Sequence, residues 1–134
     1  MKSFGLLKID HHTADIYTLG GKEEHKITEE TLQDPKHLHW HLHNKKVKNG
    51  TSKPNDTAYF KEVYNDIKGF DSIIVASHGT GKSNEGANFI KFLEQHHKDI
   101  ASKVYGTVAT DDHETEAQLL AKVDYDALLV HLKK

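Results

Sequence analysis

A glycine-rich turn that could bind phosphate follows an apolar run in the second half of the chain. Residues 76–83 read A-S-H-G-T-G-K-S, directly after S-I-I-V. Gly81, Lys82 and Ser83 match the end of the Walker A pattern G-x-x-x-x-G-K-[ST], whose backbone N–H groups and lysine hold nucleotide phosphates. Ala76 stands where that pattern requires its first glycine. A nucleotide-binding loop is therefore one interpretation of this turn.

The residues around the turn favour two simpler interpretations. After the turn comes one further convincing strand, and no apolar run ends in an aspartate that could bind magnesium as a Walker B strand does. Glycines suit a strand-to-helix turn, and Ser83 is predicted to cap the helix that follows. A helix N-terminus beside a lysine also favours an anion such as an RNA phosphate. The residues of this second hypothesis are Gly79, Gly81, Lys82 and Ser83.

Four of the twelve histidines alternate with other residues in the segment H-L-H-W-H-L-H at 37–43. This period-two pattern predicts a strand with one apolar face and one imidazole face. Neighbouring imidazoles, ~6.5–7 Å apart, could bind a transition metal as a pair, whereas the outermost two are ~20 Å apart and cannot share one ion. A solvated face or a pH-sensitive interface is the alternative. The histidines concerned are His37, His39, His41 and His43.

The elements that position these residues follow from the spacing of apolar side chains. Strands are predicted at 4–9, 14–19 and 37–43, and a polar lysine-rich loop then leads to a helix that Asp56 caps and Gly69 ends. Two buried strands at 71–77 and 104–110 alternate with helices at about 84–97 and beyond 111. This order predicts one α/β domain over 1–134. An antiparallel meander followed by strand–helix crossovers forms a mixed five-stranded, ribonuclease-H-like sheet flanked by helices.

Carboxylates and histidines follow the three strands that this topology makes parallel. Because the carboxyl ends of parallel strands share one sheet edge, these side chains are expected to lie together. Two-metal nucleases of this fold hold their ions with carboxylates on the first strand, the first helix and the fourth strand. A histidine follows the fourth strand here, so polar caps at strand ends are the competing interpretation. The candidate residues are Asp10, Glu62, His78 and Asp111.

Composition narrows the classes of partner. All 18 basic residues are lysines and the net charge is −2, so the bidentate arginine contacts that read bases are missing, which argues against sequence-specific DNA recognition. No apolar stretch approaches the ~20 residues of a membrane helix. Lys8 and Asp10 come too early for a signal peptide, and without cysteine there is no disulfide or thiolate metal site. We expect a cytoplasmic protein that makes no membrane contact and uses no cofactor.

Three segments together resemble a known family. They are the I-D-H at 9–11, the apolar strand entering the glycine turn at 79–83, and K-V-Y-G-T-V-A-T-D-D-H-E-T-E-A-Q-L-L-A-K-V at 103–123. This combination is similar to the middle domain of archaeal and eukaryotic peptide-chain release factors. It resembles still more closely the small bacterial proteins related to that domain, often labelled translational machinery proteins. The resemblance spans essentially the whole chain and implies a ribonuclease-H-like fold.

The catalytic tripeptide of release factors is missing from the matching stretch. In that family a Gly-Gly-Gln before the first long helix helps water to attack the peptidyl-tRNA ester. The corresponding residues 45–57 contain no such tripeptide, and Gly20-Gly21-Lys22 lies in a different turn and lacks the glutamine. The resemblance also covers only the middle domain of the family. Pelota-type ribosome-rescue factors likewise lack the tripeptide, so the resemblance implies a non-catalytic role.

We therefore predict a non-catalytic, translation-associated protein that binds the ribosome or structured RNA. The glycine turn and the lysine-rich loop are the expected contacts, and a solvated connection is the alternative for the loop. Two other functions stay open: a metal-dependent phosphodiesterase or nuclease at the strand ends, and an interaction module, such as a homodimer formed through the histidine-bearing strand. The loop lysines concerned are Lys45, Lys46, Lys48 and Lys53.

Overall fold

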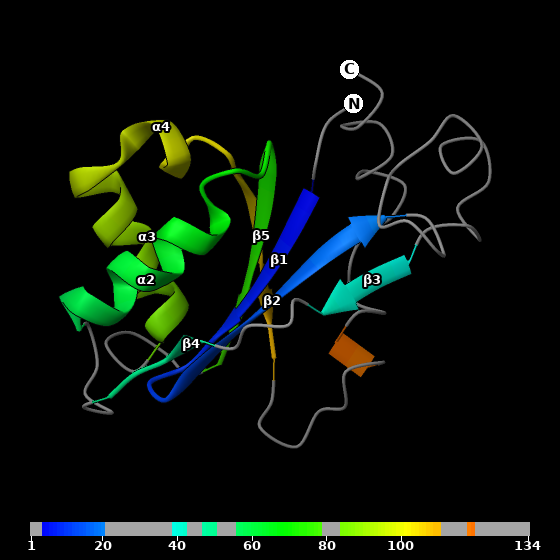
Figure 1. Ribbon diagram of the computed structural model, residues 1–134, viewed down its shortest axis with the longest axis horizontal. Coiled ribbons are helices and arrows are strands. Elements are labelled where there is room, and N and C mark those ends of the chain that lie inside the picture. Colours follow the sequence, from blue (N-terminus) through cyan, green and yellow to red (C-terminus); the bar gives the residue numbers. More distant parts are fainter. Residues whose placement is uncertain are drawn as a thin grey trace.

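A mixed β-sheet organises the part of the chain that the structure describes. The structure, a computed structural model, describes residues 4–20, 39–42, 47–50, 56–78, 84–110 and 118–119, with backbone alone for residues 20 and 39–42. The strands are β1 (Phe4–Ile9), β2 (Thr13–Gly20), β3 (His39–Leu42), β4 (Val47–Lys48), β5 (Ser72–Ser77) and β6 (Val104–Ala109). Their order is β3-β2-β1-β5-β6, and β4 also pairs with β2 (Figure 1).

The strand directions confirm the predicted topology. β1 pairs with β2, and β2 with β3, in antiparallel fashion, so these strands form a meander. β5 then lies parallel to β1 and β6 lies parallel to β5, each reached through a crossover that contains helix. An antiparallel meander followed by parallel crossovers is the arrangement of a ribonuclease-H-like sheet. The fold prediction is therefore confirmed.

Three helices cover one face of this sheet (Figure 1). They are α2 (Thr57–Ile67), α3 (Glu85–His96) and the short α4 (Lys98–Ala101). The Asp56 carboxylate accepts a hydrogen bond of 3.0 Å from the backbone N–H of Tyr59, so the predicted cap of α2 is present. Apolar residues at helical spacing give α2 a buried stripe that faces the sheet: Tyr59, Phe60, Val63 and Ile67.

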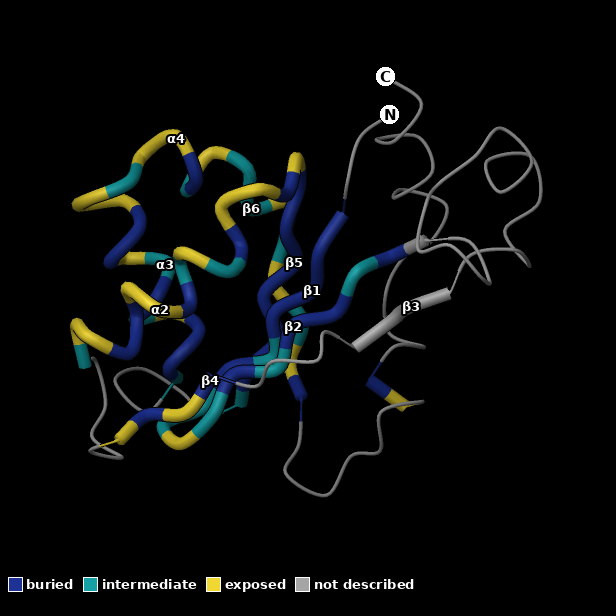
Figure 2. Tube along the Cα trace, in the orientation of Figure 1, coloured by how far each residue is buried: buried dark blue, intermediate teal, exposed yellow. Residues whose placement is uncertain are grey.

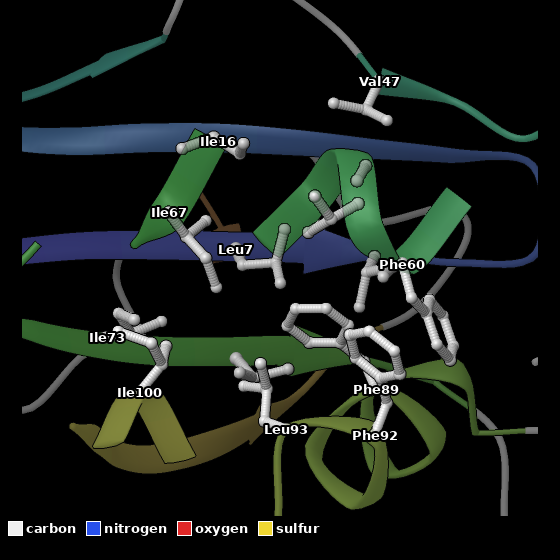
Figure 3. Close-up of a cluster of buried hydrophobic side chains, with 14 of the residues drawn as sticks. Leu7, Ile16, Val47, Phe60, Ile67, Ile73, Phe89, Phe92, Leu93 and Ile100 are labelled. Carbon is white, nitrogen blue, oxygen red and sulfur yellow. The ribbon is translucent and has the colours of Figure 1, made fainter. Parts of the chain in front are cut away.

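Aromatic rings fill the space between the helices and the sheet (Figure 3). Phe60 of α2 meets Phe89 of α3 edge to face, with ring centroids 5.3 Å apart, and Phe92 at 5.6 Å. These rings pack with apolar side chains of β1, β2 and β5 in one cluster. Full burial of each large side chain stabilises the fold by roughly 1.5–3 kcal/mol relative to exposure. This cluster attaches α2 and α3 to the strands whose ends form the site described below.

The other face of the sheet is apolar and buried as well. Leu6 of β1 and Ile74 of β5 lie opposite each other on that face, and both are buried. Every residue of β5 is buried, which confirms a strand covered on both faces (Figure 2). Leu119, in the short described segment 118–119, is buried too. The other residues of the helices predicted beyond 111 lie outside the described ranges.

Three local predictions need correction. The lysine-rich segment is not loop throughout, because Val47 and Lys48 form β4 and Val47 is only 1% exposed. β6 occupies the predicted position but is not buried: its residues alternate between half-buried and exposed, and Tyr105 is 40% exposed (Figure 2). Among the described residues it pairs with β5 alone, so it lies at the edge of the described sheet.

The third correction concerns the start of α3. Asn84, and not Ser83, is its N-cap, since the Asn84 side chain accepts a hydrogen bond of 2.9 Å from the backbone N–H of Ala87. α4 was not predicted at all, because four residues are too few to show a helical period.

None of the helices in the described ranges has the length and apolar character that crossing a membrane requires.

Candidate functional site at the carboxyl ends of the parallel strands

The carboxyl ends of β1, β5 and β6 lie side by side. Lys8 of β1 pairs with Ala76 of β5, and Ser77 of β5 pairs with Ala109 of β6. The next residues, Asp10 and His78, therefore lie at the same edge of the sheet. Open α/β sheets bind their ligands at such an edge. The structure thus brings together two of the four candidate residues there, and Asp111 lies outside the described residues.

The carboxylate of Asp10 stabilises the turn between β1 and β2. Its Oδ1 accepts hydrogen bonds from the backbone N–H groups of His12, at 2.7 Å, and Thr13, at 2.8 Å. The Asp10 N–H donates in turn to the Thr13 carbonyl at 3.0 Å. Aspartate side chains commonly hold turns in this way, by bonding the backbone two or three residues ahead. The position of Asp10 is therefore explained without a bound metal.

Two further side chains, from distant parts of the sequence, hold the same turn. Asn49, which is 6% exposed, donates its Nδ2 to the His11 carbonyl at 2.8 Å, and its backbone N–H donates to the His12 carbonyl at 2.8 Å. The Tyr59 hydroxyl donates to the Asp10 carbonyl at 2.9 Å. Sequence reasoning missed both residues. For Tyr59 the sequence did contain a signal: a tyrosine on the buried face of a predicted helix needs a hydrogen-bond partner for its hydroxyl.

The electrostatic surroundings keep Tyr59 protonated. Its pKa is raised well above its usual range, chiefly because the side chain is buried and 3% exposed. The carboxylates of Asp10, Glu85 and Asp15 raise this pKa further by disfavouring a second negative charge. The neutral phenol is thus a permanent hydrogen-bond donor to the turn. Proton abstraction by Tyr59 at neutral pH is not a function of this arrangement.

Two carboxylates of the helices differ in their surroundings. Glu62 is exposed on α2. Glu85, at the start of α3, is 1% exposed and accepts a hydrogen bond of 2.9 Å from the Asn88 side chain. Within the described ranges, no group of three histidine, aspartate or glutamate side chains is arranged to hold a metal ion.

The start of α3 lies directly against the end of β5. The Ser77 hydroxyl donates to the Asn84 side-chain oxygen at 2.6 Å, so the cap of α3 is bonded to the strand. Gly86 permits this contact, because a Cβ at that position would lie 2.9 Å from Ser77 Cβ and 3.0 Å from Val75 Cγ1. These contacts hold Ser77 and Asn84, which come before and after the glycine turn in the sequence, next to each other. The four candidate residues of the turn, Gly79, Gly81, Lys82 and Ser83, lie outside the described residues.

Of the lysines in the predicted loop, the structure describes Lys48. It is exposed on β4 and pairs with Thr13 at the start of β2, beside the turn that Asn49 holds. Lys45, Lys46 and Lys53 lie outside the described residues. The backbones of His39 and His41 lie in β3, opposite Gly20 and Thr18 of β2. The arrangement of the imidazoles, including those of His37 and His43, lies outside what the structure describes.

A cleft opens between α3 and β6 next to these strand ends. Its volume is about 270 Å³. It is lined by Ser77 and His78, by Asn84, Ala87 and Ile90 at the start of α3, and by residues 107–110. It exists because α3 packs over β5 and β1, as its contacts show, and leaves the same face of β6 partly exposed.

Comparison with known proteins gives a structural match and no sequence match. The chain matches no protein-family model, and no curated protein matches it. It is similar to the crystal structure of Pelota from Archaeoglobus fulgidus, with a TM-score of 0.64, 15% identity and 98% of this chain covered. Pelota from Thermoplasma acidophilum gives a TM-score of 0.56 and 16% identity over 96% of this chain. The chain spans 34% of either protein, so the similarity shows that it has the fold of part of Pelota.

Proposed function

We propose that this protein binds structured RNA, that of the ribosome first of all, and catalyses no reaction. The observation that carries the proposal is the similarity of almost the whole chain to about a third of archaeal Pelota. The resemblance of its sequence to the release-factor middle domain agrees with that similarity, and the chain has no Gly-Gly-Gln in the matching stretch. A protein with this fold and without the tripeptide suits a binding role.

The strand-end edge supports the proposal because both expected contact segments are attached to it. β4 carries exposed Lys48, and Asn49 ties β4 to the turn after β1. The glycine turn connects His78, at the end of β5, with Asn84, which is bonded to Ser77. One RNA segment lying along this edge would pass both Lys48 and the residues that flank the glycine turn. Lysine binds phosphate as a flexible point charge and needs no fixed geometry to do so.

The state of the candidate catalytic groups also favours binding over hydrolysis. The Asp10 carboxylate is engaged by two backbone N–H groups, and a tyrosine hydroxyl reaches this turn from α2 while Glu62 is exposed. A metal-dependent nuclease needs carboxylates directed at a shared ion. We therefore expect purified protein with Mg²⁺ or Mn²⁺ to leave RNA intact. Cleavage that Asp10→Asn abolishes would replace this proposal with the nuclease.

Sedimentation of lysates on a low-salt sucrose gradient tests the proposal. We expect the tagged protein to migrate with ribosomal particles, before or after translation is stalled, and to leave them as salt rises, because lysine–phosphate contacts release counterions. Sequencing the RNA that crosslinks to the protein would identify the site. A protein that stays wholly in the light fractions under both conditions contradicts the proposal.

A charge-reversal pair identifies the contact surface. Changing all four lysines of the predicted loop to glutamate is expected to move the protein to the light fractions; these are Lys45, Lys46, Lys48 and Lys53. The matched control makes the same charge change at four exposed lysines of the helices and the turn after α2: Lys61, Lys68, Lys91 and Lys98. Equal loss in both variants would mean that net charge, and not this surface, governs binding.

A further inference from the structure

We propose that the cleft between α3 and β6 holds one unpaired nucleobase of the bound RNA. This inference rests on the proposed RNA-binding function and assigns a specific subsite to it. Proteins recognise single-stranded RNA mostly through bases that are turned out of a helix, placed against side chains and hydrogen-bonded along their edges. The cleft offers the chemistry, the size and the position that such a base requires.

The chemistry of the lining selects a neutral, planar group. Ala87 and Ile90 of α3 and Ala109 of β6 supply apolar surface, while Ser77, Asn84 and Thr107 supply hydroxyl and amide groups. Lysine, aspartate and glutamate are all missing from the described lining, so a phosphate or an ammonium group would find no opposite charge there. A base matches this mixture, because its faces are apolar and its edges carry donors and acceptors. The imidazole of His78 adds a ring on which a base can stack.

The size and position of the cleft agree with one nucleoside. Pockets for drug-sized ligands measure roughly 300–1,000 Å³, and this cleft, at about 270 Å³, lies just below that range. It lies at the carboxyl ends of β5 and β6, next to His78 and Asn84, the two residues that flank the glycine turn. A base in the cleft would leave its phosphates outside, at the strand-end edge of the sheet.

Titration of the labelled full-length chain with free nucleosides tests the subsite. Adenosine, cytidine and uridine should each shift the backbone amide resonances of residues 77–78, 87–90 and 107–110, with dissociation constants on the order of 0.1–10 mM, as expected for ligands of this size. Inorganic phosphate should leave the resonances of residues 107–110 unchanged, because the described lining contains no lysine. Residues 77–78 and 87–90 do not serve for this comparison, because they flank the glycine turn, where phosphate is itself an expected ligand. Shifts of residues 107–110 caused by phosphate but by no nucleoside would overturn the inference.

Two variants of exposed alanines show whether the cleft is the site. Ala87→Leu fills it and should weaken nucleoside binding by about tenfold or more, which corresponds to about 1.4 kcal/mol of binding free energy. The matched control, Ala58→Leu, makes the same change in the first turn of α2, outside the lining, and should change affinity less than about twofold. Equal effects of the two would overturn the inference. If Ala87→Leu does not give a native amide spectrum, Thr107→Val is used instead. This change keeps the shape of the side chain and removes its hydroxyl, and it should also weaken nucleoside binding by about tenfold or more.

The subsite and the general function can fail separately. If the protein sediments with ribosomes but nucleosides leave the cleft resonances unchanged at about 10 mM, where even the weakest expected site would be half occupied, the subsite is wrong and the RNA-binding function stands. If nucleosides bind in the cleft and the protein never associates with RNA, the RNA-binding function is wrong, and the cleft is then a site for a free nucleoside.

Discussion

The hydroxyl of Tyr59 on α2 donates a hydrogen bond of 2.9 Å to the backbone carbonyl of Asp10, just beyond the end of β1. This bond joins the first described helix to the first strand across 49 positions of sequence. Because Tyr59 is buried, water cannot replace the donor if it is removed. The turn at the strand-end edge is therefore held partly by the helix layer, and four predictions follow from this arrangement and from its neighbours.

Tyr59→Phe should lower the free energy of unfolding by about 1–3 kcal/mol at neutral pH, because the Asp10 carbonyl loses its partner. The difference from wild type should shrink above about pH 10, where tyrosine ionises in the unfolded chain. The raised pKa of Tyr59 keeps the folded phenol protonated, so wild-type stability falls as pH rises. Urea denaturation from pH 7 to 11 measures this. A difference that stays constant to pH 11 would contradict the prediction; Tyr105→Phe, at an exposed ring, is the control.

Asp10→Ala should destabilise the protein by about 1–2 kcal/mol, because two backbone N–H groups of the turn lose their acceptor. Asp10→Asn keeps a side-chain oxygen in the same place and should cost about half as much or less. Thermal and urea denaturation of the two variants at pH 7 give the comparison. If both variants lose the same stability, the charge of Asp10 matters more than its hydrogen bonds.

Gly86→Ala should destabilise the protein by about 1–3 kcal/mol, the usual cost of overpacking. The new Cβ would meet Ser77 and Val75 at the end of β5. This sign opposes helix propensity, which favours alanine over glycine by up to about 1 kcal/mol. Gly69→Ala is the control, since nothing lies within 4 Å of a Cβ there. Equal or greater stability of Gly86→Ala would show that β5 and α3 separate easily.

Asn49→Ala should lower stability by about 1–3 kcal/mol, because the buried side chain bonds the His11 carbonyl. Asn49→Asp should cost at least as much, since it places a carboxylate oxygen where an N–H donor is needed. Asn65→Ala, at an exposed position of α2, should stay within about 0.5 kcal/mol of wild type. Denaturant titration compares the three, and a neutral Asn49→Ala would mean that β4 does not brace the turn.

The elements with a strong local pattern were predictable from the amino-acid sequence. The continuous apolar run of β5 indicated a strand covered on both faces, and Asp56 with the spaced apolar residues after it indicated α2. The alternation of strands and helices then favoured the observed topology, because chain connections between neighbouring strands are short and right-handed. Asp10 and His78 could be assigned to one edge on the same grounds.

Contacts between distant segments could not be predicted in this way. Val47 and Lys48 form a strand because β2 offers them a partner and Asn49 bonds the turn beside it; their own residues show no period. β6 is half exposed because it lies at the edge of the described sheet. The cleft forms because α3 packs over β5 and β1 and leaves the helix-side face of β6 partly uncovered. Apolar spacing records which face of an element is buried. Which element packs against that face, and the hydrogen bond between Tyr59 and Asp10, depend on strand register and tertiary packing. Neither can be inferred from a local stretch of sequence.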